Sequence, residues 1–293
     1  MKPLEGKVAV VAGATRGAGR GIAVSLGEAG ATVYCTGRTT RDHPSPMKRP
    51  ETIEETADMV TERGGNGIPV RVDHSVESEV QALFERVRAE QNGQLDILVN
   101  DIWGSESNIH WDKAFWEEDV QTAIHVQETA VHTHMITSRY GVPLMVERGT
   151  GLILEITDGQ TYKVRGPLPY SMAKIGTIHM AEVMAAQLDW KGLTGITALA
   201  LTPGFLRSEE MLERFGVTEE NWREGAKVDP DFILSESPRY VGRAAAALGG
   251  DPGVHRFHGQ ALSSWELMHE YGFTDIDGTQ PDWGKHYGED AER

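Results

Sequence analysis

VAVVAGATRGAG, at residues 8–19, decides the fold of this chain. The first five residues form a short apolar run that ends at a glycine, which is typical of a strand buried on both faces. A helix is expected to follow over residues 20–29. Glycines after a strand can form a simple turn, but a strand, glycine loop and helix in this order predict a dinucleotide site. Glycines let the backbone approach the pyrophosphate, and the helix N-terminus supplies amides and a positive dipole. The expected contacts from this loop are Gly13, Thr15, Arg16, Gly17, Ala18 and Gly19.

Apolar runs and amphipathic segments alternate along the rest of the chain. The further strands are expected at residues 32–36, 68–73, 95–100, 151–157, 196–201 and 260–262. The further helices are expected at residues 51–63, 77–91, 114–147, 169–190 and 239–248. This alternation predicts a Rossmann-type, doubly wound parallel sheet with helices on both faces, built as one α/β domain over residues 1–293. The polar tail after Gly272 is expected to be flexible.

Composition limits the possible partners. The 293 residues are 39% hydrophobic, which suffices for a large core, and 28 basic against 44 acidic residues give a formal net charge of -16. So acidic a protein is not expected to bind nucleic acid or an anionic membrane. The single cysteine, Cys35, excludes an intramolecular disulfide and fits a reducing compartment. The first residues lack the apolar core of a signal peptide, so a cytoplasmic protein is expected.

Two arginines favour NADP(H) over NAD. In such folds an acid at the end of the second strand holds a free ribose 2′-hydroxyl, whereas an arginine accommodates a 2′-phosphate. Here Arg38 follows that strand, no acid occurs before Asp42, and Arg16 adds a second cation. The alternative for Arg38 is a solvated surface arginine. Asp73 could accept a hydrogen bond from the adenine amine and Asn100 could brace the backbone beneath the cofactor, or either could be only a cap.

Tyr170 and Lys174 form the second chemical signature. They lie four residues apart near the start of the helix that begins at Pro169, so they share one helix face. An ammonium beside a phenol stabilises the phenolate and is expected to lower its pKa toward neutrality. Alone, such a pair is usually two solvated neighbours. Behind a cofactor site, it predicts a proton donor or acceptor with a positioning cation.

Taken together, these residues resemble the short-chain dehydrogenase/reductase family over roughly residues 5–265. The matching marks are Gly13-x-x-x-Gly17-x-Gly19, Val99-Asn100, Tyr170-x-x-x-Lys174, and Pro203-Gly204 with Ser208. Residues 111–116 and 271–275 look like one branch of that family. The resemblance implies that the tyrosine handles the proton, that the lysine holds the nicotinamide ribose, and that the cofactor is NAD(P). It also implies cofactor contacts from Asn100, Lys174, Pro203, Gly204, Leu206 and Ser208.

Two positions depart from the family pattern. Asp158 stands where a serine usually steadies the substrate oxygen, and His125 stands where a helix asparagine usually anchors a water. Thr157 cannot simply substitute, because neighbouring strand residues face opposite sides. Asp158 could be a protonated donor, a site for a cationic or hydroxyl-bearing substrate group, or only a turn residue. His125 could hold the water, titrate against Asp158, or be a packed helix histidine.

These features predict an NADP(H)-dependent oxidoreductase that interconverts a carbonyl and an alcohol, with Tyr170, Lys174, Asp158 and His125 as candidate catalytic residues. No metal is expected, since His132 and His134 diverge on a helix. The alternative is an NADP-binding protein with little redox activity. A homodimer or homotetramer through the helices after the fourth and fifth strands is implied by the resemblance. Apolar side chains expected around a small substrate are Trp103, Trp111, Tyr162, Phe205, Met211 and Trp222.

Overall fold

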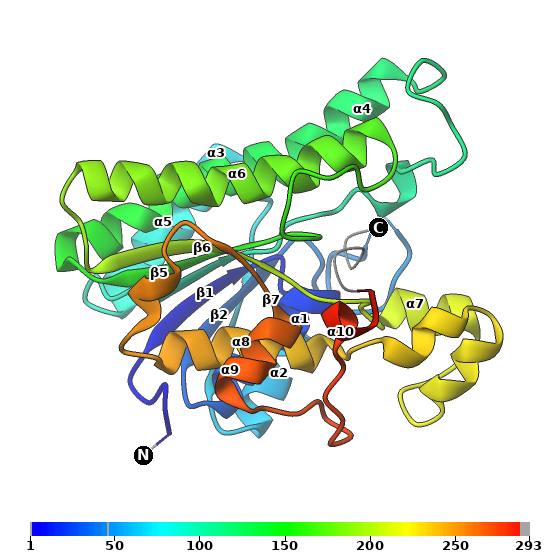
Figure 1. Ribbon diagram of the computed structural model, residues 1–293. Helices are drawn as coiled ribbons and strands as arrows, with labels where there is room; N and C mark the ends of the chain where they lie inside the picture. The colour runs from blue at the N-terminus through cyan, green and yellow to red at the C-terminus, as the bar shows by residue number, and fades with distance from the viewer. Residues whose placement is uncertain (1, 46, 288–293) are drawn as a thin grey trace.

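A seven-stranded parallel sheet with the order β3-β2-β1-β4-β5-β6-β7 forms the centre of the protein (Figure 1). The computed structural model describes residues 2–45 and 47–287. The predicted Rossmann-type α/β fold is confirmed, because every neighbouring pair of strands is parallel. The strands are β1 Val8–Ala12, β2 Thr32–Gly37, β3 Asn66–Arg71, β4 Ile97–Asn100, β5 Gly151–Ile156, β6 Ile196–Thr202 and β7 Ala261–Ser263.

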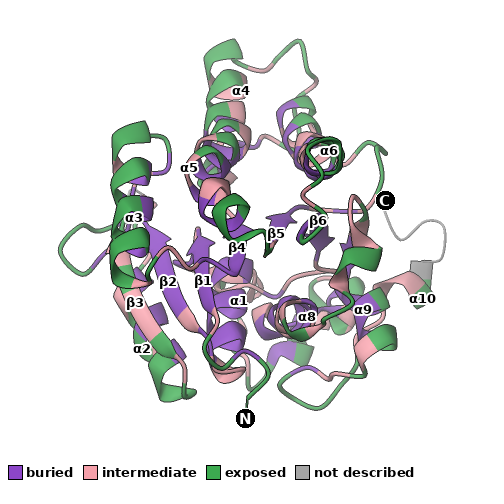
Figure 2. Ribbon diagram, turned by 90° about the vertical axis from the view of Figure 1, so that its left-hand side faces the viewer, coloured by how far each residue is buried: buried purple, intermediate pink, exposed green. Residues whose placement is uncertain are grey.

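Helices cover both faces of the sheet, and the buried sheet lies between them (Figure 2). Strand alternation explains why both faces are apolar. Val8 and Val10 of β1 pack on one face, with the helices α3, α5 and α6, while Ala9 and Val11 pack on the other, with α1, α2 and α8. The helices are α1 Gly17–Glu28, α2 Ile53–Glu62, α3 Glu77–Glu90, α5 Thr133–Arg148, α6 Leu168–Trp190 and α8 Pro238–Gly250.

The expected helix over residues 114–147 is only partly correct. Helix α4 (Val120–Gln127) begins six residues later, and a π-helical turn over Glu128–His132 separates it from α5. Such a turn holds an extra residue and rotates the helix face that follows it. The rotation changes which side chains reach the cavity described below.

The carboxyl-terminal third contains elements that the sequence pattern did not predict. They are α7 Glu209–Phe215, the 3₁₀ turns Trp222–Lys227 and Pro230–Leu234, α9 Ser264–Tyr271 and α10 Trp283–Tyr287. The expectation of a flexible tail after Gly272 is wrong for Asp275, which is buried and ion-paired to Arg207 at 3.0 Å.

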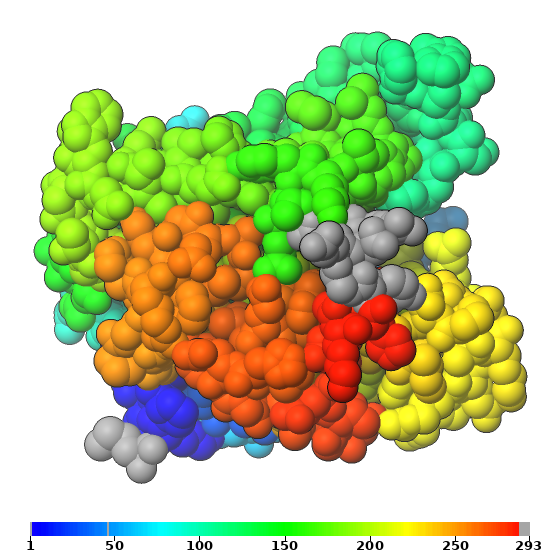
Figure 3. Space-filling view, viewed as in Figure 1, coloured from blue at the N-terminus to red at the C-terminus, as the bar shows by residue number. Residues whose placement is uncertain are grey.

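The carboxyl ends of the strands lie at one end of the molecule, where ligands of doubly wound folds bind. Two chain segments project there, residues 105–120 and residues 205–235 (Figure 3). Among the residues described, no helix has the length and apolar character needed to cross a bilayer.

Candidate active site

A cavity of about 880 Å³ lies at the carboxyl ends of the strands. It brings together most of the residues predicted from the sequence. Those that line it are Gly13, Thr15, Arg16, Gly17, Ala18, Arg38, Asp73, Asp158, Tyr170, Lys174, Pro203, Gly204, Leu206 and Ser208. Three predicted residues lie outside its lining, namely Gly19, Asn100 and His125.

The glycine loop needs its glycines. Gly13 has φ +92°, and a Cβ there would lie 2.2 Å from the carbonyl oxygen of Asp101. A Cβ at Gly19 would lie 2.3 Å from the carbonyl oxygen of Gly13. The loop therefore packs against the end of β4 at a distance that no side chain allows, and the cavity side stays open to a pyrophosphate. Gly19 supports the loop from behind and does not face the ligand.

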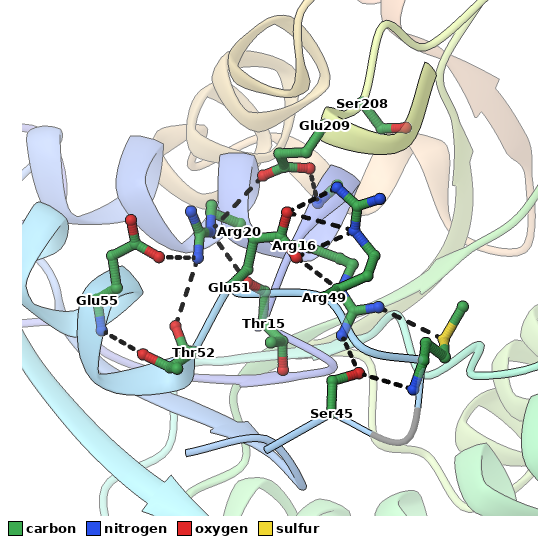
Figure 4. A network of polar contacts seen from close by, with 12 residues as sticks. Thr15, Arg16, Arg20, Ser45, Arg49, Glu51, Thr52, Glu55, Ser208 and Glu209 are labelled. Atoms are coloured by element: carbon green, nitrogen blue, oxygen red, sulfur yellow. Dashed lines mark hydrogen bonds and ion pairs between the residues drawn. The ribbon is translucent and has the colours of Figure 1, made fainter. Parts of the chain in front are cut away.

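Arg16 and Arg38 line the part of the cavity next to β2. Arg16 Nη2 donates to Ser45 Oγ at 3.3 Å, and its Nε lies 3.7 Å from Glu51 Oε2 (Figure 4). That buried Nε has no hydrogen-bond partner among the described residues. Arg38 is exposed and reaches over the cavity toward Gly104. Two guanidiniums beside an open cavity fit the charge of a phosphate.

A carboxylate occupies the N-terminus of α1. The Gly17 N–H donates to Glu209 Oε2 at 2.8 Å, and Glu209 Oε1 lies 3.7 Å from Arg20 Nε (Figure 4). Helix N-termini favour anions, which explains this contact between α1 and α7. A pyrophosphate that uses the Gly17 amide would compete with Glu209 for it.

Tyr170 donates its hydroxyl hydrogen to Asp158 Oδ2 at 2.6 Å. Asp158 follows β5, and Tyr170 lies in the first turn of α6, so the two elements bring them together. Burial, and then the Asp158 carboxylate, raise the pKa of Tyr170 well above its ordinary value. The expectation of a lowered pKa is therefore wrong. Tyr170 is a protonated phenol at neutral pH in this arrangement.

Lys174 lies beside the aromatic rings rather than at the phenol oxygen. Its Nζ is 4.3 Å from the centroid of Trp103 and 5.4 Å from that of Tyr170. This cation–π position explains why the ammonium does not offset the burial of the phenol. The Thr157 hydroxyl donates to the Lys174 carbonyl at 2.8 Å, so Thr157 holds α6 against β5.

His125 is exposed, and its Nδ1 lies 3.8 Å from Glu128. The structure does not bring it to Lys174 or Asp158. Thr129 and Thr133 line the cavity from this stretch of helix, because the π-helical turn changes the face that points inward. Counting along an uninterrupted helix could not locate them.

Asp101 is a site residue that the sequence analysis missed. It follows β4 and lines the cavity, and burial raises its pKa to about 7 against the opposing effects of Lys174, His134 and the Gly19 amide. Its position directly after a buried strand was the available signal. Asn100 lies below the cavity, where its Nδ2 donates to Ser138 Oγ at 2.9 Å and to Glu155 Oε1 at 2.6 Å.

Part of the expected apolar lining of the substrate pocket is present in the cavity. Trp103, Trp111, Phe205 and Met211 line the cavity, together with Trp265 and Trp283. Tyr162 and Trp222 do not, since Tyr162 is exposed and Trp222 packs beneath Arg207.

A sequence profile described as short chain dehydrogenase matches residues 7–218. The chain belongs to the short-chain dehydrogenase/reductase family. Members of this family use NAD or NADP. Dehydrogenase/reductase SDR family member 1 of Mus musculus is 36% identical over 95% of this chain and 86% of that protein. Its Homo sapiens counterpart is 34% identical over 94% and 85%. This is the branch that residues 111–116 and 271–275 indicated.

Solved structures of short-chain dehydrogenases share the fold. A short chain dehydrogenase from Mycobacterium thermoresistibile superposes with a TM-score of 0.77 at 25% identity, covering 93% of this chain and 90% of that one. A hydroxysteroid dehydrogenase from Escherichia coli gives 0.66 at 24% identity, covering 89% and 96%.

The Pro203–Gly204 loop rests on a buried carboxyl group. The Gly204 N–H donates to Glu236 Oε2 at 2.9 Å, and Ser264 Oγ donates to the same oxygen at 2.5 Å. Burial raises the pKa of Glu236 from 4.5 to about 8. The hydrogen bonds from Ser264 and the Gly204 amide oppose the shift, as does the charge of Arg207, whereas the charge of Asp275 adds to it.

The raised pKa of Glu236 predicts that the stability of the protein depends on pH. Between these two pKa values the folded state binds the proton more tightly than the unfolded state, so the free energy of unfolding should fall as pH rises. The slope is at most about 1.4 kcal/mol per pH unit, and the free energy should level off above pH 8. Glu236→Gln cannot titrate, and we expect the difference in unfolding free energy between wild type and this variant to fall from pH 5 to pH 8. Urea unfolding at four pH values measures it. A pH-independent difference would refute the assignment.

Proposed function

We propose that this protein is an NADP(H)-dependent oxidoreductase that interconverts a carbonyl and an alcohol on a small, partly apolar substrate. The observation that carries the proposal is the shared cavity, which the glycine loop, Lys174 and the protonated Tyr170 all line. When bound, the nicotinamide would supply or accept the hydride. Tyr170 would donate the proton to the substrate oxygen, and Lys174 would orient the ribose and add positive charge.

The positions of the other predicted residues determine their roles in the proposal. Asp158 would be catalytic because it accepts a hydrogen bond from the Tyr170 hydroxyl, the group that transfers the proton. His125 has no part, because it lies outside the cavity. The pyrophosphate would lie on residues 13–19 and the nicotinamide near Pro203 and Gly204. The proposed compartment is the cytoplasm, supported by the single cysteine, Cys35, which is buried and free.

The preference for NADP over NAD rests on Arg16 and Arg38, and on the glycine that ends β2 where an acid would hold a 2′-hydroxyl. We expect NADPH to bind roughly 10- to 100-fold more tightly than NADH, and Arg38→Ala to remove most of that difference, since hydrogen bonds to charged groups contribute about 1.5–3 kcal/mol. Fluorescence titration measures both affinities. Arg41→Ala is the control. Arg41 follows Arg38 in the same loop, but its exposed side chain pairs with Asp58 of α2 and does not line the cavity. Equal affinities in the wild type would contradict the proposal.

Turnover is tested by NADPH consumption with a panel of ketones and aldehydes between pH 5 and pH 9. Binding without turnover at any pH would favour the second candidate, a family member with little redox activity. Asp158 is the observation behind that candidate, since it places a hydrogen-bond acceptor where the family resemblance implies a serine donor.

We also propose a homodimer or homotetramer through α4, α5 and α6. The support is a set of exposed apolar side chains on these helices, namely Ile124, Met135, Val146, Met172 and Val183. Light scattering of the purified protein measures the assembly, and a monomer at micromolar concentration would exclude it.

A further inference from the structure

The N-terminus of α1 has no acidic group of its own. Arg16, at the cap position, makes no side-chain hydrogen bond to the first turn, and that turn contains no acidic residue. The first amides of a helix have no acceptor within the helix, and they carry the positive end of its dipole. The acceptor for the Gly17 amide comes instead from a segment far along the chain.

Glu209, the first residue of α7, supplies that acceptor (Figure 4). Its Oε2 accepts from the Gly17 N–H at 2.8 Å, across 192 residues of chain. Its Oε1 lies 3.7 Å from Arg20 Nε, but that N–H donates to the Thr15 carbonyl at 2.9 Å. The Gly17 amide is therefore the shortest polar contact of this carboxylate, and separating the two costs one hydrogen bond and a weak ion pair.

A dinucleotide pyrophosphate needs the same place. Thr15, Gly17, Ala18 and Glu209 line one cavity, and the amides at the start of α1 are the donors proposed for the pyrophosphate. A carboxylate and a phosphate oxygen cannot share one N–H at full strength, and a carboxylate beside a doubly charged pyrophosphate repels it. Binding at these amides therefore requires Glu209 to leave.

A second contact ties α7 to the residues that flank the glycine loop. Arg49 Nη1 donates to Glu213 Oε2 at 2.7 Å, one turn beyond Glu209 on the same helix. The Arg49 side chain is 13% exposed and also pairs with Glu51 at 2.8 Å (Figure 4). A carboxylate that is held nearby in this way competes with a ligand as if it were present at high concentration.

We propose that Glu209 is an internal competitor of the dinucleotide: its carboxylate takes the pyrophosphate subsite at the N-terminus of α1, and the cofactor displaces it on binding. The inference rests on the proposed function, because it assumes that the cofactor binds at the glycine loop. The Glu209 side chain is 26% exposed, so water can receive the displaced carboxylate. Met211 of the same helix also lines the cavity, so displacement of Glu209 couples cofactor binding to the wall of the substrate pocket.

Glu209→Ala tests the competition directly. We expect the variant to bind NADPH about 10-fold more tightly than the wild type does, a difference equivalent to about 1.4 kcal/mol. NADH carries the same pyrophosphate and should show the same gain. Adenosine 2′-phosphate has no pyrophosphate, so its affinity should change by less than about threefold, because salt screens the more distant charge. Calorimetry measures the three dissociation constants in both proteins.

The same variant should be less stable without a ligand, because the Gly17 amide loses its acceptor. We expect its Tm to fall by about 2–4 °C in the absence of cofactor. Saturating NADPH should then raise its Tm by more than it raises that of the wild type. Opposite changes of stability and affinity distinguish a competitor from a residue that only holds the site together, since loss of such a residue would weaken both.

Glu210→Ala is the matched control. Glu210 follows Glu209 in the same turn of α7 and lines the same cavity, but the Gly17 amide donates to Glu209. Its removal should change NADPH affinity by less than about threefold. Equal gains in Glu209→Ala and Glu210→Ala, or a gain for adenosine 2′-phosphate as large as that for NADPH, would indicate general repulsion and overturn the inference.

Binding also separates this inference from the proposed function. Unchanged NADPH affinity in Glu209→Ala overturns the inference even if the wild type reduces ketones. Tighter binding of NADPH and NADH to Glu209→Ala, with no reduction of any ketone by the wild type, supports the competition and removes the proposed function.

Discussion

Replacing Tyr170 by phenylalanine is expected to lower kcat/KM for carbonyl reduction by roughly 100- to 10,000-fold, the range that a positioned general acid contributes. The phenol is half-buried in the cavity wall, and its desolvation together with the Asp158 carboxylate raises the pKa of Tyr170, so the phenol keeps its proton at neutral pH. The variant retains the ring that packs on Trp103 and Trp111, so the loss should lie in proton transfer and not in folding. Steady-state kinetics with the best ketone measure it, and the affinity for NADPH should stay within about threefold.

The control for this variant is Tyr140→Phe. Tyr140 donates its hydroxyl to Glu77 at 2.6 Å on the outer surface of α5 and takes no part in the cavity. Activity in Tyr140→Phe should match the wild type. More than a tenth of the wild-type kcat/KM in Tyr170→Phe would mean that another group delivers the proton.

Replacing Arg207 by alanine is expected to cost about 3–5 kcal/mol of unfolding free energy, or roughly 6–20 °C in Tm. Arg207 is fully buried, and it donates to Glu219 at 2.9 Å and to the Ser235 carbonyl at 2.6 Å. It also pairs with Asp275 and packs over Trp222, 4.3 Å from the ring centroid. The variant would leave a buried carboxylate without its partner, which is the costly way to break an ion pair.

Arg223→Ala provides a matched comparison on the same ring. Arg223 also lies over Trp222, at 4.5 Å, and pairs with Asp277 at 2.8 Å, but its side chain is 54% exposed. Exposed pairs contribute about 0–1 kcal/mol, so this variant should be nearly neutral. Urea unfolding monitored by fluorescence gives both values. Similar effects for the two variants would show that the buried cluster does not hold the 205–235 segment in place.

The structure also explains why one motif was predictable and its chemistry was not. A spacing of four residues places Tyr170 and Lys174 on one face of any helix, and α6 keeps them there. The pKa of the phenol depends instead on how much water the surrounding elements exclude and on the position of the Asp158 carboxylate, which follows β5. Both quantities come from contacts between segments that are far apart in the chain.

The sequence by itself determined the parallel sheet, the glycine loop and the tyrosine–lysine pair, because apolar periodicity, glycine spacing and helical repeat are local properties of the chain. Tertiary structure alone decided that His125 faces outward, that Asp101 and Thr129 face the cavity, and that Asp275 of the polar tail is buried against Arg207. A π-helical turn and the packing of distant segments produce these results. Desolvation and charge pairing across the fold have no signature in a single stretch of residues.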